Sequence, residues 1–171
     1  SGIGAAMADT FAAEGARVAV CDADAAAVSA FAAARPEMRT RRADVSDETS
    51  LGAFLDDVER DWGGADVVCA NAGTAGQAGP VETLELGPWR DCLAVGLDGS
   101  FLTARWAARV MGAQGSGLLL LTSSTSGLFG YPGRLPYAAA KWGVIGMMKT
   151  LAMELGPRGV NVNCVRAGVV D

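Results

Sequence analysis

The chain has 171 residues, half of them hydrophobic, with 23 glycines, few aromatic residues and a net charge of −5. This length suffices for one domain with a substantial core, and an acidic balance without a basic stripe argues against a nucleic-acid partner. The sequence contains no histidine, which excludes catalysis by Ser-His-Asp or Cys-His groups and the common zinc ligand sets, so we expect no metal site.

The cysteines are widely spaced and form no C-x-x-C pair: Cys21, Cys69, Cys92 and Cys164. Three of them lie in or at the end of apolar, strand-like runs, where a buried free thiol is ordinary. We therefore expect a reducing, cytoplasmic setting. No apolar run reaches the length of a membrane span, so no membrane partner is expected, while the sequence leaves N-terminal targeting open.

The first half of the chain alternates between helical and strand-like runs, in the order helix 1–15, strand 17–22, helix 24–34 and strand 38–42. Ser46 is the expected N-cap of a further helix, which Gly63 and Gly64 should stop. The second half continues in the order strand 65–70, loop 74–88, helix 89–111, strand 118–122, a helix from Tyr137 to Leu155, and strand 160–165.

Strands separated by helical runs of ten or more residues predict βαβ units and a mainly parallel sheet, in a single domain over 1–171. Right-handed crossovers place the carboxyl ends of such strands at one edge of the sheet. Residues that directly follow the strands should therefore gather at that edge, namely Asp22, Asp44, Asn71, Ser124 and Gly168.

The stretch from Ser123 to Lys141 follows a strand of four leucines and leads into a long apolar helix. Tyr137 and Lys141 are four residues apart, which places both on one face of that helix. The ordinary pKa of a phenol is too high for efficient general acid–base catalysis at neutral pH. A neighbouring ammonium lowers this pKa by stabilising the phenolate. The alternative is an amphipathic helix on which the two side chains share no role.

With these motifs in place, the sequence resembles the short-chain dehydrogenase/reductase family along essentially its whole length. Six motifs occur in the family's order, with Ser124 thirteen residues before Tyr137: S-G-I-G at 1–4, Asp22, Asp44-Val45, Asn71-Ala72-Gly73, Ser124, and Y-A-A-A-K at 137–141. Each alone is weak, whereas their common order is specific. The resemblance implies an α/β fold, a Rossmann-like doubly wound parallel sheet in a three-layer α/β/α arrangement.

Family members carry a first strand before the position of Ser1, and a substrate-covering segment and final strand beyond Asp171. In the family fold that first strand is central, between the strands at 17–21 and 65–70. We therefore interpret the chain as a form that lacks both ends. We expect the polypeptide 1–171 to be unstable by itself, because the ladder partners and packed faces of a central strand are missing.

By this resemblance, Gly2, Ile3 and Gly4 belong to a glycine-rich loop that brings backbone amides to a pyrophosphate at a helix N-terminus. Asp22 follows Gly4 by eighteen residues, near the spacing at which a carboxylate accepts ribose hydroxyls, and it would repel a 2′-phosphate. No basic residue follows it, which favours NAD over NADP. Local sequence alone also fits a flexible chain start, and an Asp22 that caps the helix near Asp24.

The resemblance implies further cofactor contacts after three later strands, namely Asp44, Val45, Asn71, Ala72, Gly73, Gly168 and Val169. The first pair would contact adenine, the N-A-G turn would support the sheet near the adenine ribose, and the last pair would lie by the nicotinamide. Local sequence alone also fits a loop before a helix for the first pair and an ordinary turn for N-A-G.

The resemblance also implies catalytic roles, in a hydride transfer between nicotinamide C4 and a secondary alcohol or ketone. Tyr137 would give or take the hydroxyl proton, Lys141 would assist it and bind the nicotinamide ribose, and Ser124 would orient the substrate oxygen. Neighbouring hydroxyls compete for the serine role, namely Ser123, Thr125 and Ser126. Spacing to Tyr137 selects Ser124, and Ser123 is expected to face away or bond to the backbone.

Two positions depart from the family pattern. Gly96 stands where most members carry an asparagine that holds a water on a proton relay to the lysine, and Ala167 replaces a proline. The leading hypothesis is still an NAD(H)-dependent oxidoreductase acting on a small-molecule alcohol or ketone. The alternatives are a catalytically weak homologue that binds dinucleotide as a sensor or structural subunit, and an unrelated Rossmann-like binding domain.

The helices at 89–111 and 137–155 are apolar on more than one face, which exceeds what one face of a sheet can cover. This pattern predicts a homodimer or homotetramer formed through them. The sequence does not identify the substrate.

Overall fold

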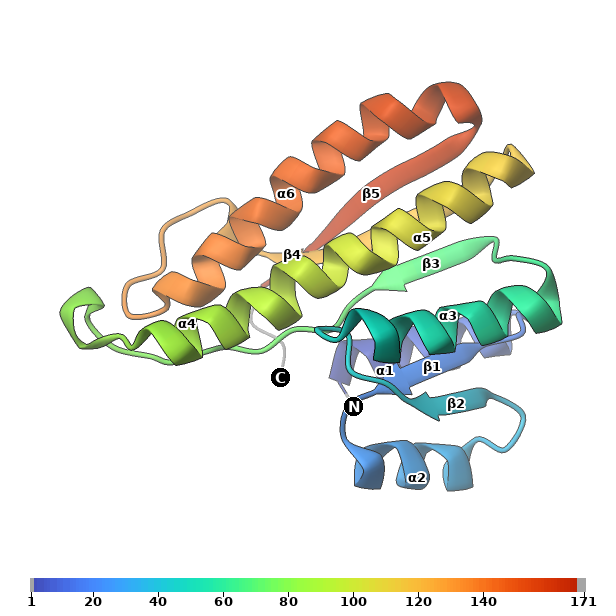
Figure 1. The fold of residues 1–171 in the computed structure, drawn as a ribbon, viewed down its shortest axis with the longest axis horizontal. Helices are drawn as coiled ribbons and strands as arrows, with labels where there is room; N and C mark the ends of the chain where they lie inside the picture. The colour runs from blue at the N-terminus through green and yellow to red at the C-terminus, as the bar shows by residue number, and fades with distance from the viewer. Residues whose placement is uncertain (1, 169–171) are drawn as a thin grey trace.

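The computed structural model describes residues 2–168, so the predicted contact at Val169 lies outside the described residues. Helices and strands alternate through these residues (Figure 1), in the order α1 Gly2–Ala13, β1 Ala19–Asp22, α2 Ala25–Ala34, β2 Arg39–Arg42, α3 Glu48–Trp62, β3 Val67–Ala70, η1 Val81–Thr83, α4 Leu86–Leu93, η2 Ala94–Asp98, α5 Gly99–Gln114, β4 Gly117–Ser124, η3 Thr125–Gly127, α6 Leu135–Leu155, η4 Gly156–Arg158 and β5 Val160–Ala167.

All paired strands run parallel, as predicted. β1 pairs with β2, opposing Asp22 to Arg42, and β4 pairs with β3 and with β5. Helices cover both faces: α3, α5 and α6 lie side by side on one face, and α1 lies behind the strands (Figure 1). The expected three-layer α/β/α architecture is therefore confirmed.

The strands form two separate sheets, β1–β2 and β3–β4–β5, with a gap between β1 and β3. A cavity of about 860 Å³ lies along both of these strands, and apolar side chains of α1, α3 and α5 contribute to its walls, among them Met7, Leu55 and Trp106. The gap coincides with the place expected for the family's first strand, between 17–21 and 65–70. Both inner strands therefore present one edge to a cavity instead of to a ladder partner.

The N-cap predicted for α3, Ser46, is wrong. The N-cap of α3 is Asp47, whose carboxylate accepts a hydrogen bond from the backbone amide of Ser50, whereas Ser46 hydrogen-bonds to Asp44 instead. Both residues are good caps, and the position of the first turn decides between them. The predicted end of this helix is confirmed, because Gly63 adopts a left-handed conformation with φ of 78°.

The prediction of a single helix at 89–111 is wrong in two respects. The helical stretch begins earlier, at Leu86, and a π-helical segment, η2, interrupts it between α4 and α5. Glycines allow close contacts around this bulge. A Cβ placed on Gly99 would lie 2.8 Å from Cγ2 of Val45, and one on Gly96 would lie 3.2 Å from Cβ of Ala140 in α6. Such bulges are rare and frequently lie at functional sites.

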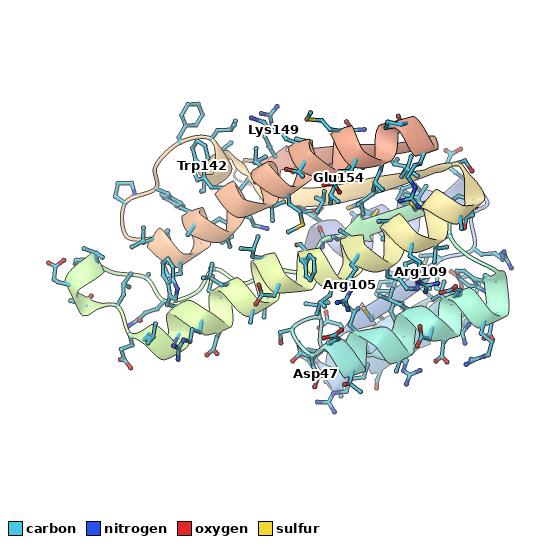
Figure 2. All side chains as sticks on the ribbon, turned by 45° about the horizontal axis from the view of Figure 1, so that its top comes forward. Asp47, Arg105, Arg109, Trp142, Lys149 and Glu154 are labelled. Atoms are coloured by element: carbon cyan, nitrogen blue, oxygen red, sulfur yellow. The ribbon has the colours of Figure 1, made fainter. Side chains whose placement is uncertain are left out.

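The hydrophobic core lies between the sheet β3–β4–β5 and the helices α3, α5 and α6. Its most deeply buried side chains are Ala107, Met111, Leu119, Leu121 and Val144. Polar pairs hold α5 to α3: Arg109 and Trp106 both bind Glu59, and Arg105 binds Glu48 (Figure 2). Cys21, Cys69, Cys92 and Cys164 are free thiols. Among residues 2–168, no helix is long and apolar enough to cross a membrane.

Candidate active site

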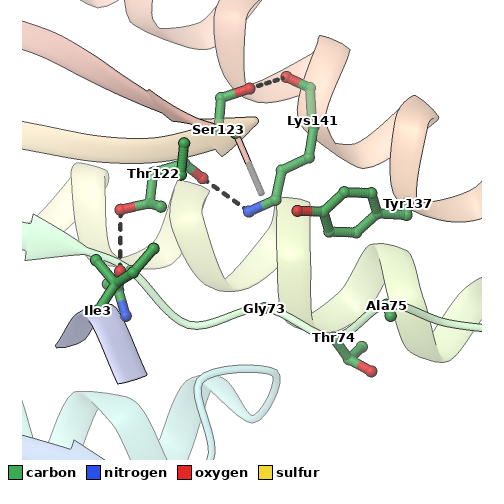
Figure 3. A pocket seen from close by; sticks show the side chains of 11 residues that line it. Ile3, Gly73, Thr74, Ala75, Thr122, Ser123, Tyr137 and Lys141 are labelled. Carbon is green, nitrogen blue, oxygen red and sulfur yellow. Dashed lines mark hydrogen bonds between the residues drawn. The ribbon is translucent and has the colours of Figure 1, made fainter. Parts of the chain in front are cut away.

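The candidate catalytic residues come from the end of β4 and the first turns of α6. β4 ends at Ser124, η3 and a loop follow, and α6 begins at Leu135 with Pro136 in its first turn, where a proline costs no hydrogen bond. The four-residue spacing then turns Tyr137 and Lys141 to the same side. The hydroxyl of Tyr137 points toward the ammonium of Lys141 (Figure 3).

Lys141 is only 4% exposed. Its Nζ donates a hydrogen bond of 2.7 Å to the backbone carbonyl of Thr122 and lies 5.5 Å from the centroid of the Tyr137 ring. Burial lowers the pKa of the Lys141 ammonium, an effect that the nearby thiols of Cys164 and Cys92 partly oppose. A lysine with a lowered pKa in a cavity is typical of functional sites.

A cavity of about 370 Å³ joins this pair to residues from distant parts of the chain: Ile3, Asn71, Gly73, Thr74, Ala75, Thr122, Ser123, Tyr137, Lys141, Ala167 and Gly168. Six of these were predicted site residues. The turn after β3 approaches Lys141 closely, since a Cβ on Gly73 would lie 3.3 Å from Nζ. A side chain at this position would therefore require Nζ to move by a few tenths of an ångström.

The two serines at the end of β4 point to different partners. Ser123 donates a hydrogen bond of 2.9 Å to the backbone carbonyl of Lys141, so the prediction that it bonds to the backbone is confirmed. Ser124 is buried, and its Oγ accepts a hydrogen bond of 3.2 Å from the amide of Ser126. Ser123 lines the cavity of Tyr137 and Lys141, whereas Ser124 lies beside it.

The remaining predicted cofactor residues lie along the larger cavity: Gly4, Asp22, Asp44, Val45 and Ala72. Asn71 and Gly73 border both cavities, so the N-A-G turn stands between the two groups of residues. Gly2 is exposed at the first position of α1.

The start of α1 fits a bound pyrophosphate. A Cβ on Gly4 would lie 2.7 Å from Nδ2 of Asn71, so glycine is needed for this close approach. The free amides of a helix N-terminus and its dipole favour a negatively charged group. The donor set at this edge therefore suits a dinucleotide.

Strand pairing brings a basic residue to Asp22 that the linear sequence does not reveal. Arg42 is the β2 partner of Asp22, and its Nε donates a hydrogen bond of 3.1 Å to the carbonyl of Ala23. One carboxylate oxygen of Asp22 accepts a hydrogen bond of 3.0 Å from the amide of Asp24, which itself caps α2. A basic residue therefore lies opposite Asp22 in the sheet, although none directly follows it in the chain.

Asp44 holds the loop before α3. Its Oδ1 accepts hydrogen bonds of 2.6 Å from the hydroxyl and 2.9 Å from the amide of Ser46. These bonds lower the pKa of the Asp44 carboxyl, and the charge of Arg42 adds to the effect. A carboxylate with a lowered pKa stays ionised at neutral pH.

Comparison with known proteins bears on what this arrangement does. The family described as enoyl-(acyl carrier protein) reductase matches residues 1–171. An uncharacterized short-chain type dehydrogenase/reductase of Sinorhizobium fredii is 35% identical over 182 residues, covering 99% of this chain and 70% of that protein. The chain belongs to the short-chain dehydrogenase/reductase family.

Relatives within the short-chain dehydrogenase/reductase family include named enzymes. The chain is 37% identical over 174 residues to D-threitol dehydrogenase of Mycolicibacterium smegmatis, covering 99% of the chain and 66% of the relative. It is 33% identical over 176 residues to levodione reductase of Leifsonia aquatica, with coverages of 99% and 66%. The chain thus spans about two thirds of the length of these relatives.

Solved structures agree in fold. A levodione reductase superimposes with a TM-score of 0.93 at 33% identity, covering 98% of this chain and 67% of that chain. NAD⁺-bound xylitol dehydrogenase gives a TM-score of 0.92 at 29% identity, with coverages of 98% and 66%.

Proposed function

We propose that the protein is an NAD(H)-dependent oxidoreductase acting on a secondary alcohol or ketone. The observation that carries this proposal is the cavity in which the hydroxyl of Tyr137 points toward the buried ammonium of Lys141, beside the N-A-G turn (Figure 3). The names of the relatives support it, because threitol carries alcohol groups and levodione reductase is named as a reductase. The physiological substrate is a small molecule of this class.

The cofactor supplies a nicotinamide C4 that accepts or gives a hydride. Tyr137 accepts the hydroxyl proton of the alcohol in one direction and returns it to the ketone oxygen in the other. Lys141 stabilises the phenolate by its charge and binds the nicotinamide ribose with an N–H not used by the Thr122 carbonyl. Ser124 orients the substrate oxygen. Its Oγ accepts a hydrogen bond from the Ser126 amide and donates a long one of 3.5 Å to the Ser126 hydroxyl, which a substrate oxygen would replace.

Cofactor binding follows the sheet edge. Backbone amides at Gly2, Ile3 and Gly4 hold the pyrophosphate, and the remaining contacts come from Asp22, Asp44, Val45, Asn71, Ala72, Gly73, Gly168 and Val169. Asp22 favours NAD over NADP, because its carboxylate accepts ribose hydroxyls and repels a 2′-phosphate. Arg42 beside it offsets part of that repulsion.

The wider setting is also proposed. The chain forms one NAD(P)-binding domain of a cytoplasmic protein without nucleic-acid or membrane partners. Exposed apolar side chains on α5 and α6 support a homodimer or homotetramer, since Phe101 is 49% and Trp142 51% exposed.

Activity with NAD⁺ and NADP⁺ on a panel of secondary alcohols, followed by reduced-cofactor absorbance, tests the proposal. Tyr137→Phe should lower kcat by roughly 10²–10⁴-fold with cofactor affinity kept, as general acid–base catalysis contributes this much. Ser124→Ala should lose more activity than Ser123→Ala, because Ser123 already bonds to a backbone carbonyl. Cofactor binding without turnover on the whole panel would instead favour the sensor or structural subunit.

A further inference from the structure

Thr122, at the end of β4, is engaged by two proposed site residues at once. Its side-chain Oγ1 donates a hydrogen bond of 3.1 Å to Oδ1 of Asn71, and its backbone carbonyl accepts the 2.7 Å hydrogen bond from Nζ of Lys141 (Figure 3). The residue is 7% exposed and lines the cavity of Tyr137. Buried hydroxyls in proteins are normally hydrogen-bonded, and the partner of this one is the side chain of Asn71.

The hydrogen bond continues the junction between β3 and β4. In the parallel register Ala70 opposes Leu121, so Asn71 and Thr122 form the next pair, where the backbone ladder ends. The side-chain bond therefore holds the start of the N-A-G turn to β4.

The turn held in this way lies between α1 and Lys141. On one side, a Cβ built on Gly4 would lie 2.7 Å from Nδ2 of Asn71. On the other side, a Cβ built on Gly73 would lie 3.3 Å from Nζ of Lys141. Small shifts of the turn would therefore change both the approach of a dinucleotide to α1 and the space around Nζ.

We propose that Thr122 is a positioning residue for cofactor binding, whose hydroxyl fixes the Asn71–Gly73 turn against Lys141. This inference rests on the proposed function. Without the hydroxyl, Asn71 loses its donor and the turn is free to shift, while the carbonyl of residue 122 still holds Lys141. Cofactor affinity should fall, and the substrate KM at saturating cofactor should stay unchanged.

Purified active protein with Thr122→Val, which keeps shape and carbonyl, provides the test, with NADH titrated by fluorescence. Loss of one neutral hydrogen bond predicts a Kd for NADH about fivefold higher, and Thr122→Ser should restore it. Thr150→Val is the control: Thr150 lines neither cavity and its hydroxyl bonds to the Gly146 carbonyl within α6, so this variant should keep the wild-type Kd. Thr122→Ala offers the same test if valine is not accommodated.

A double-mutant cycle tests whether Thr122 affects cofactor binding through Asn71. If Thr122 acts through Asn71, Thr122→Val should raise the Kd no further in an Asn71→Ala background. A wild-type Kd in Thr122→Val, or an equal loss in Thr150→Val, would overturn the inference while leaving the oxidoreductase intact. Wild-type protein that neither binds NADH nor turns over would overturn the proposed function itself.

Discussion

At the scale of single residues, Lys141 is the group whose burial matters most. Its ammonium is almost fully removed from water, with one hydrogen bond to the Thr122 carbonyl and a cavity on its other side. Burial of a charge without a carboxylate partner destabilises a fold. The lysine is therefore expected to serve function at the expense of stability.

Replacing Lys141 by methionine in the purified active protein should abolish turnover and leave its melting temperature at pH 7 equal or higher. Because the pKa of Lys141 is lowered in the folded protein, the unfolded chain binds more protons between that value and its ordinary pKa. Stability of the wild type should therefore rise with pH through this window, and this rise should be weaker in Lys141→Met. Thermal unfolding between pH 7 and 10 measures it.

Lys149→Met is the control, since Lys149 is exposed on the same helix (Figure 2). It should keep the wild-type pH dependence. An unchanged pH slope in Lys141→Met would contradict the assignment of the buried charge.

Asp22 and Arg42 together should set cofactor preference. Asp22→Ala should reduce the ratio of kcat/KM for NAD⁺ over NADP⁺ by about tenfold, the worth of a hydrogen bond to a charged group. Arg42→Gln should move the ratio in the opposite direction, because the positive charge next to Asp22 is removed. Steady-state kinetics with NAD⁺ and NADP⁺ give this ratio of kcat/KM. If Asp22→Ala and Arg42→Gln change the ratio in the same direction, the two residues do not have opposing roles.

At the scale of elements, the contact between η2 and α6 explains the glycine at position 96. Gly96 is buried, and a Cβ there would lie 3.2 Å from Cβ of Ala140. The helices can approach this closely because neither position carries a larger side chain. An asparagine at position 96, as in most of the family, would need more room on α6.

Gly96→Ala should therefore destabilise the protein by about 1 kcal/mol, because overpacking of roughly 1–3 kcal/mol exceeds the ~1 kcal/mol gained from helix propensity. Gly52→Ala in α3 is the control. A Cβ at position 52 meets nothing within 4 Å, so this variant should stabilise the protein. Adding Ala140→Gly should recover stability in the Gly96→Ala background, as measured by denaturant unfolding. If the proton relay limits turnover, Gly96→Asn should raise kcat only with Ala140→Gly present.

At the scale of the whole molecule, the gap between β1 and β3 predicts the behaviour of the isolated chain. A cavity of about 860 Å³, whose walls include apolar side chains of α1, α3 and α5, separates the two sheets. The polypeptide 1–171 should therefore unfold without a cooperative transition and bind a dye for exposed apolar surface. A sharp thermal transition in calorimetry would contradict this prediction.

Self-association is the second prediction at this scale. Trp142 on α6 and Phe101 on α5 are about half exposed, and Met153 is 81% exposed. Trp142→Glu should shift the molar mass of the active protein toward the monomer in light scattering. Val81→Glu in η1, outside these helices, should not, and a wild-type monomer would refute the proposed interface.

The sequence by itself determined the alternation of elements, the parallel sheet, the end of α3 at Gly63, and the common face of Tyr137 and Lys141. These features depend on hydrophobic period and on residues three or four apart, which a linear pattern contains. The family motifs added the expected gap between β1 and β3. The choice of Asp47 over Ser46 as a cap, and the π-helical break at η2, were missed, because packing selects among similar local conformations.

Only the tertiary structure decided which residues meet across strands. Arg42 lies opposite Asp22 in the β1–β2 register, and Thr122 hydrogen-bonds to Asn71 where the β3–β4 pairing ends. These separations of 20 and 51 residues carry no periodic signal. It also placed Ser123, and not Ser124, among the residues that line the cavity of Tyr137 and Lys141. Register and helix packing depend on the burial of the whole core, so no short segment of the sequence encodes them.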